Sequence, residues 1–132
     1  MVLFITFKNK TIMLKIINDL PGNVLGVEAE GEVTGADYET VLIPAVDEKL
    51  KVNRKMRMLY YFGPGFTGFS LKAMMEDAGV GIKNFSAWDR VALVSDHELI
   101  NGLAKFFGHL LSGEVKVFGN AGLDEAKKWI AE

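Results

Sequence analysis

Residues 56–79 read MRMLYYFGPGFTGFSLKAMMEDAG, and this stretch decides the fold. Met58–Phe62 is an unbroken apolar run, which is typical of a strand that is buried on both faces. The glycines of Gly63–Gly68 predict a loop, and the spacing after them predicts a helix over Phe69–Ala78. Open α/β sheets hold their sites at the carboxyl ends of strands, so we expect the functional site at this loop. The apolar stripe expected to face the core consists of Leu71, Met74, Met75 and Ala78.

The composition predicts one domain with a substantial core. The chain has 132 residues, 49% of them hydrophobic, and a chain of this size buries roughly two-thirds of its unfolded surface. The formal net charge is −2 and no basic run is present, so a nucleic-acid partner has no electrostatic support. Cysteine is absent, which excludes disulfides and thiolate metal sites and suits the cytoplasm. No apolar run approaches the ~20 residues that a transmembrane helix needs.

Val24–Val33 is the clearest amphipathic strand of the chain. Its outer face carries Glu28, Glu30 and Glu32. Three carboxylates on one face are compatible with acid–base chemistry or with a cation site, but nothing else convergent accompanies them, so a solvated sheet face is the favoured explanation. We therefore predict a strand with one polar, solvated face.

The next segment is predicted to be helical. Thr34 and Asp37 have the spacing of a capping box, and an apolar stripe continues to about Lys51. Pro44 lies inside this stripe, where it removes a backbone donor. The helix is therefore expected to kink or to divide in two.

The remainder of the chain alternates strands and helices. Val80–Asp89 is predicted to be irregular, and Val91–Val94 to be a second buried strand. Ser95 followed by Glu98 predicts a helix cap, and Val115–Phe118 reads as an edge strand. The inward stripes expected for the last two helices are Leu99, Leu103, Phe106 and Leu110, and then Leu123, Ala126 and Ile130. This alternation predicts a parallel sheet with right-handed crossovers.

The spacing Gly63-x-Gly65-x-x-Gly68 matches the letters of a dinucleotide-binding loop. A phosphate cradle needs backbone N–H groups, and Pro64 supplies none. Asp96 lies further along the chain than the acidic residue of that motif. A nucleotide is therefore the less favoured ligand for this loop.

Two residues near the loop have two interpretations each. Thr67 and Ser70 fit helix caps, or they are phosphoacceptors at the positive end of a helix.

His97 and His109 are separated by about 120° around a helix, so a shared metal is not expected. No catalytic triad pattern is present, so no catalytic residue, metal or cofactor is predicted.

Apolar side chains are expected to gather near the same edge of the sheet. They either fill the core or line a concave site for a small apolar ligand. They are Phe66, Phe69, Met74, Met75, Phe85 and Trp88. Met56 and Met58 are expected in the core as well. The candidate ligand- or partner-binding residues are Gly65, Phe66, Thr67, Gly68, Phe69, Ser70, Met74 and Trp88.

Five segments carry a family resemblance. They are Met13-Leu14-Lys15-Ile16, Tyr38-Glu39-Thr40-Val41-Leu42-Ile43-Pro44-Ala45, Phe66-Thr67-Gly68-Phe69, Arg90-Val91-Ala92-Leu93-Val94 and Ala126-Lys127-Lys128-Trp129-Ile130. They resemble the SpoIIAA-like family, a bacterial branch of the STAS (sulfate transporter and anti-sigma-factor antagonist) superfamily. The resemblance implies an α/β fold built as a βα superhelix. Its sheet has about five mostly parallel strands with an antiparallel first strand, and four or five helices surround it.

The resemblance also carries expectations about function. It implies a non-catalytic regulatory or interaction domain with a protein partner. Thr67-Gly68 is the nearest match to the serine that is phosphorylated in anti-sigma-factor antagonists, although the Asp-Ser-Gly pattern around that serine is absent. The related CRAL-TRIO domain carries lipids, which implies the alternative of an apolar or lipid ligand.

The resemblance covers Met13 to Ala131, so residues 1–12 are expected to form an extension to a single domain over residues 13–132. Val2–Phe7 alternates like a strand that would pair with Ile12–Ile17 through a turn at Lys8-Asn9-Lys10. Such an apolar edge strand needs to be covered. We therefore expect a homodimer joined near this hairpin.

Overall fold

The computed structural model describes residues 12–132, which form a five-stranded sheet in the order β1-β2-β3-β4-β5. The strands are β1 (Leu14–Ile17), β2 (Val24–Val33), β3 (Met56–Phe69), β4 (Trp88–Val94) and β5 (Glu114–Phe118). The helical elements are α2 (Gly35–Asp37), the π-helical η1 (Tyr38–Leu42), α3 (Ile43–Val52), α4 (Leu71–Lys83), α5 (Glu98–Phe107) and α6 (Leu123–Ala131). Short 3-10 turns lie at η2 (Gly108–Leu110) and η3 (Asn120–Gly122). β1 is antiparallel to β2 and the other pairs are parallel, which confirms the predicted fold class. The predicted strand Val2–Phe7 lies outside the described residues.

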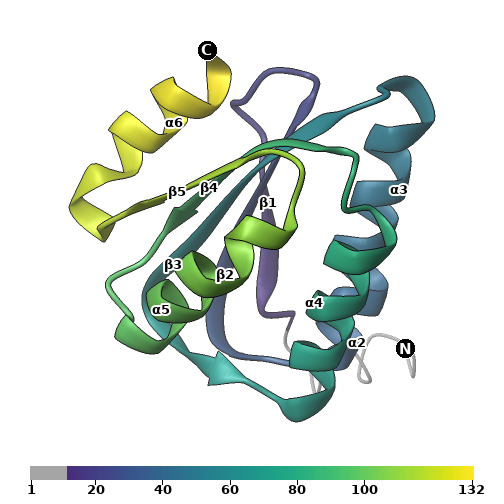
Figure 1. The fold of residues 1–132 in the computed structure, drawn as a ribbon. Helices are drawn as coiled ribbons and strands as arrows, with labels where there is room; N and C mark the ends of the chain where they lie inside the picture. The colour runs from purple at the N-terminus through teal and green to yellow at the C-terminus, as the bar shows by residue number, and fades with distance from the viewer. Residues whose placement is uncertain (1–11) are drawn as a thin grey trace.

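Helices cover both faces of the sheet, and among the described residues α6 is the one long helix on its side (Figure 1). Side chains of a strand alternate between faces, so Tyr60 packs in the larger core beneath α2 to α5, while Leu59 packs beneath α6. Ala126 and Ile130 of α6 are fully buried, as the spacing predicted. No helix in the described part of the chain has the length and apolar content to cross a membrane.

β3 differs most from its prediction, because the segment Gly63–Gly68 is strand and not loop. The long strand β2 supplies its partners, with Gly31 opposite Phe66 and Val33 opposite Phe69. The register shifts twice here, between Ala29 and Gly31 and again between Gly31 and Glu32. Such a bulge accommodates Pro64, which has no N–H for a ladder. The predicted loop is therefore wrong, and β3 continues beside β2 past the end of β4, whose last residue, Val94, lies opposite Tyr61.

The first helical segment follows its sequence signals. The Thr34 hydroxyl accepts a hydrogen bond from the Asp37 amide at 3.4 Å, and the Asp37 carboxylate accepts one from the Thr34 amide at 2.7 Å. This is the predicted capping box. The π-helical turn η1 then precedes α3, and Pro44 lies in the first turn of α3. A wider turn provides room for a proline that cannot donate to the preceding turn.

Two other predicted boundaries are wrong. α4 continues to Lys83, so only the short segment from Asn84 to Ala87 is irregular before β4. α5 begins at Glu98 with His97 as its N-cap residue, and the Ser95 hydroxyl accepts from the His97 amide at 2.8 Å. Ser95 therefore orders the turn before the helix and does not cap it.

Two arginines attach α6 to the sheet. Arg57 donates to the carbonyl of Ile130 at 2.9 Å, and Arg90 donates to the carbonyl of Trp129 at 2.8 Å. Both carbonyls lie in the last turn of α6, where a positive charge is favourable. The Arg90 guanidinium also lies over the Trp129 ring at 4.9 Å.

Candidate functional site

An aromatic cluster occupies the carboxyl end of β3. The rings of Phe66 and Phe69 lie 5.3 Å apart, and those of Phe62 and Phe66 lie 4.8 Å apart, both edge to face. Tyr60 stacks on Phe62 at 4.3 Å. Edge-to-face contacts of this kind add about 0.5–1.5 kcal/mol each to the burial of the rings. The rings of Phe66 and Phe69 therefore fill the core, where they contact one another and do not line a ligand cavity.

A chain of hydrogen bonds lies beside this cluster. The Tyr38 hydroxyl is 2.6 Å from the Asp77 carboxylate and 2.9 Å from the Tyr60 hydroxyl. Tyr38 has one hydroxyl hydrogen, which it donates to Asp77, so Tyr60 donates to Tyr38. Burial raises the pKa of both tyrosines, and the nearby Asp77 carboxylate raises them further. The two hydroxyls therefore remain protonated near neutral pH.

Asp77 connects this core network to solvent. The residue lies on an exposed part of α4, but one carboxylate oxygen is directed toward Tyr38. Desolvation raises the pKa of Asp77, and the hydrogen bond from Tyr38 opposes that increase. Water reaches the residue from the outer side, so the carboxyl is only partly desolvated. Sequence reasoning missed this network, because Tyr38 and Tyr60 fitted apolar stripes and Asp77 fitted a polar face.

The Tyr38–Asp77 bond coincides with an unexpected orientation of α4. Ala73 and Val80 form the inner side of the helix, where Ala73 is fully buried, and Asp77 lies at the border of that side, exposed but with one carboxylate oxygen directed toward Tyr38. The apolar stripe lies on the outer side, where Leu71 is 75% and Met75 is 67% exposed. The prediction that this stripe faces the core is therefore wrong. The outward apolar residues, named the α4 surface here, are Leu71, Met74, Met75 and Ile82.

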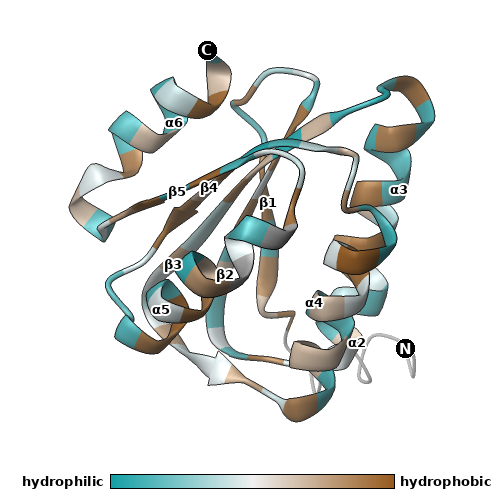
Figure 2. Ribbon diagram, in the orientation of Figure 1, coloured by the Kyte–Doolittle hydropathy of each residue, from teal (hydrophilic) through white to brown (hydrophobic). Residues whose placement is uncertain are grey.

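Figure 2 shows apolar segments on both α4 and α5, the two helices nearest the viewer. On α5, Leu99 is 63% and Phe106 is 72% exposed, although both were predicted to face the core. Among the residues of α5 whose burial is described, Ile100 is buried. Large exposed apolar groups on two helices that cover the same face of the sheet are typical of an interaction surface.

The candidate residues around Thr67 occupy different positions. Thr67 is exposed within β3, so its predicted place at the start of the helix is wrong. Ser70 is the N-cap of α4 and accepts from the Ala73 amide at 3.1 Å, as predicted. Gly68 has a φ of 149°, a backbone conformation that glycine adopts readily. Gly65, Thr67, Gly68 and Ser70 thus line the connection from β3 into α4.

Trp88 does not belong with the other candidate residues. It begins β4 and pairs with Met56 at the start of β3, whereas Phe66 lies toward the other end of β3. Trp88 is buried, and Phe85 is 55% exposed on the turn before it. The predicted gathering of all these apolar groups at one edge of the sheet is therefore wrong.

The glycine segment does not form a phosphate cradle. A Cβ at Gly63 would lie 3.3 Å from a carboxylate oxygen of Glu28, and one at Gly65 would lie 3.3 Å from an oxygen of Glu30. A phosphate bound at these glycines would lie close to both carboxylates, and their negative charge would repel it. The backbone here is extended and does not open a helix, so the less favoured nucleotide interpretation loses its structural basis. In residues 12–132 no three acidic or histidine side chains form a group that could hold a metal ion.

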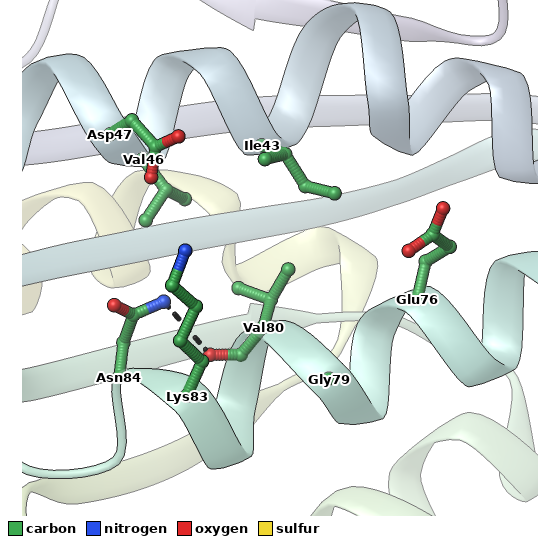
Figure 3. A pocket seen from close by; sticks show the side chains of 8 residues that line it. All are labelled: Ile43, Val46, Asp47, Glu76, Gly79, Val80, Lys83 and Asn84. Carbon is green, nitrogen blue, oxygen red and sulfur yellow. Dashed lines mark hydrogen bonds between the residues drawn. The ribbon is translucent and has the colours of Figure 1, made fainter.

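Two hollows lie away from the candidate residues. One lies between α3 and α4, where the Asn84 amide donates to the Val80 carbonyl at 3.0 Å (Figure 3). Its volume of about 250 Å³ is small for a ligand site, since such sites measure roughly 300–1,000 Å³. The other, of about 560 Å³, lies between α5, η2 and β5.

Comparison with known proteins supports the fold and the family. A sequence model of the SpoIIAA-like family matches residues 24–131. A comparison with curated proteins finds no match. A similar solved structure is that of an uncharacterized protein of the DUF3478 family with a SpoIIAA-like fold, from Shewanella loihica PV-4. It is 24% identical, with a TM-score of 0.69 over 89% of this chain and 91% of the other. The chain therefore belongs to the SpoIIAA-like family, a STAS-like family.

Proposed function

We propose that this chain is a non-catalytic regulatory domain that binds a protein partner through the α4 surface. The observation that carries this proposal is the outward orientation of the apolar stripe of α4, with Leu71 and Ile82 each 75% exposed. Exposing such a stripe to water is unfavourable by about 25 cal/mol for each Å² of apolar area. A partner that covers it recovers this free energy.

The shape of the site favours a protein partner over a small apolar ligand. Small-molecule sites are concave and enclose most of the ligand. The α4 surface lies on the outer side of a helix, and Phe66 and Phe69 beside it are packed against each other. An outward apolar helix face is the element that binds a hydrophobic groove of another protein. The carrier of an apolar or lipid ligand is therefore the weaker alternative.

The chemistry of the site favours binding over catalysis. General acid–base catalysis works best with a pKa near the operating pH. The pKa values of Tyr38 and Tyr60 are raised instead, which keeps both groups protonated. The hydrogen bonds from Tyr60 to Tyr38 and from Tyr38 to Asp77 join α4 to the core, which is a structural role.

Thr67 and Ser70 are the proposed phosphoacceptors that regulate this binding. Ser70 caps α4 immediately before Leu71, and Thr67 is exposed on the strand that leads into the helix. A phosphate adds about −1.5 to −2 charges at neutral pH, and the start of a helix accommodates that charge. A negative group beside the α4 surface would oppose docking in an apolar groove.

Capture of partners from native cells tests the proposal. We expect the protein to retain a reproducible partner that is lost in the double variant Leu71→Glu/Met75→Glu. Val52→Glu is the matched control, because Val52 is 83% exposed on α3. Purified partner and variants are then compared by calorimetry. Equal affinity for both variants would place the partner elsewhere, and a lipid retained by the native protein in mass spectrometry would favour the carrier.

A further inference from the structure

We propose a second binding site at the free edge of β5, which accepts an extended peptide of a partner protein as an additional strand. This site is separate from the α4 surface and does not depend on it. The sheet order places β5 at one end, so within residues 12–132 its only neighbouring strand is β4. Addition of a strand to such an edge is a common way to bind a peptide.

The backbone of β5 has unpaired groups of known direction. The Ser95 amide donates to the Phe118 carbonyl at 2.8 Å, so the Phe118 backbone faces β4. Backbone groups alternate in direction along a strand. The N–H and C=O groups of Val115 and Val117 therefore face away from the sheet. Val115 and Val117 each offer one donor and one acceptor, and with these groups an added strand can form a hydrogen-bond ladder.

A hollow of about 560 Å³ runs along this edge. On the strand side it is lined by the consecutive residues Gly113–Val117. Val115 and Val117 lie opposite Val91 and Leu93, so their side chains are on the face of the sheet that holds the larger core. The Lys116 amine lies over the Phe118 ring on the opposite face. A hollow that touches all of these residues must follow the backbone edge. On the helix side it is lined by Ala104, Lys105, Gly108, His109 and Leu111.

The lining determines the chemistry of the peptide. Every second side chain of an added strand points to the same face and would enter the space between α5 and β5. Ala104, Leu111 and Val117 make that space apolar, so apolar side chains fit there. The exposed amines of Lys105 and Lys116 outnumber the carboxylate of Glu114 in the lining, which favours an acidic residue next to them. The expected ligand is an extended segment with alternating apolar side chains and at least one carboxylate.

The test begins with selection of short linear peptides from a displayed random library against the full-length protein. The tightest peptide is then synthesised with a single N-methyl group at each position in turn. We expect binding, measured by fluorescence anisotropy, to weaken about tenfold at every second position and to change little between them. An added strand directs alternate N–H groups toward β5, so this period of two is specific to strand pairing.

Variants of the protein provide the second arm. Val117→Pro removes an outward N–H that β4 does not use, and an edge strand tolerates such a proline. Val117→Thr keeps the N–H and a similar shape, and it is the matched control. We expect about tenfold weaker binding for the proline variant only. If that variant does not fold, the N-methyl series on the unchanged protein still tests whether the peptide binds as an added strand.

Four outcomes would overturn the proposal. The first is that no selected peptide binds the protein. The second is an N-methyl series without a period of two. The third is amide protection by the peptide on β1 or α4 and not on Val115 and Val117. The fourth is a dimer in light scattering that Val117→Pro dissociates, because a second copy would then occupy the edge.

Discussion

Replacing Tyr38 with phenylalanine tests whether the hydrogen-bonded chain holds α4 on the core. The substitution removes the hydroxyl that joins Tyr60 to Asp77 and leaves the ring in place, 6.3 Å from that of Phe69. Tyr60 is 5% exposed, so its hydroxyl would lose its partner inside the protein. Leaving a buried donor unpaired costs about 1–3 kcal/mol, whereas Asp77 can turn to water. We expect a loss of about 2 kcal/mol in the free energy of unfolding.

The matched variant is Tyr60→Phe, which removes only the donor at the buried end of the chain. Tyr38 still donates to Asp77 in this variant, so we expect a smaller loss of about 0.5–1.5 kcal/mol. The double variant leaves no unpaired hydroxyl. It should therefore be no less stable than Tyr38→Phe alone, and clearly more stable than the sum of the two single changes.

Urea denaturation followed by circular dichroism measures these differences. With a slope of about 2 kcal/mol per M, the Tyr38→Phe midpoint should fall by about 1 M. A Tyr38→Phe loss no larger than that of Tyr60→Phe would contradict the direction of the chain. Strict additivity in the double variant would show that the two hydroxyls do not interact.

Three further predictions concern pH, helix attachment and capping. The folded-state pKa values of Tyr38 and Tyr60 are raised above 10.0. Their contribution to stability is therefore present below pH 10 and is lost as the pH rises above it. Urea titrations at increasing alkaline pH should show a steeper loss of stability for the native protein than for the double phenylalanine variant, and parallel curves would contradict this. Arg90→Met removes the hydrogen bond to the end of α6 and should cost about 1–2 kcal/mol in thermal unfolding, whereas an unchanged melting temperature would mean that packing alone holds α6. Ser70→Ala should cost about 1 kcal/mol because Ser70 caps α4, and Thr67→Ala should stay within about 0.5 kcal/mol; equal losses in urea denaturation would refute this difference.

The alternation of strands and helices was sufficient to predict the sheet. Val91–Val94 and Met58–Phe62 were recognisable because buried parallel strands are continuously apolar. The extension of β3 through Gly63–Gly68 was not, because a glycine can mark a bulge within a strand as well as a turn. It depends on β2, which is long enough to pair with the segment.

The orientation of α4 shows where the prediction of the site failed. An apolar stripe on a helix normally faces the core. In this chain the stripe points outward, and a carboxylate oxygen of the exposed Asp77 is directed toward the core by its hydrogen bond with Tyr38, which is 39 residues earlier. A pairing at that separation has no signal in a single sequence. The grouping of Trp88 with Phe66 failed for a different reason, since Trp88 begins β4 at the opposite end of the sheet from Phe66.

Photo-cross-linking from α4 in native cells addresses the proposed binding surface most directly. A photoreactive phenylalanine analogue is placed at Met75, which is 67% exposed on α4, and in a separate variant at Val52, which is 83% exposed on α3. We expect a protein adduct from Met75 that is absent from Val52, and its formation should cease when Leu71→Glu is added. Equal adducts from both positions, or an adduct from Val52 alone, would contradict a partner on the α4 surface.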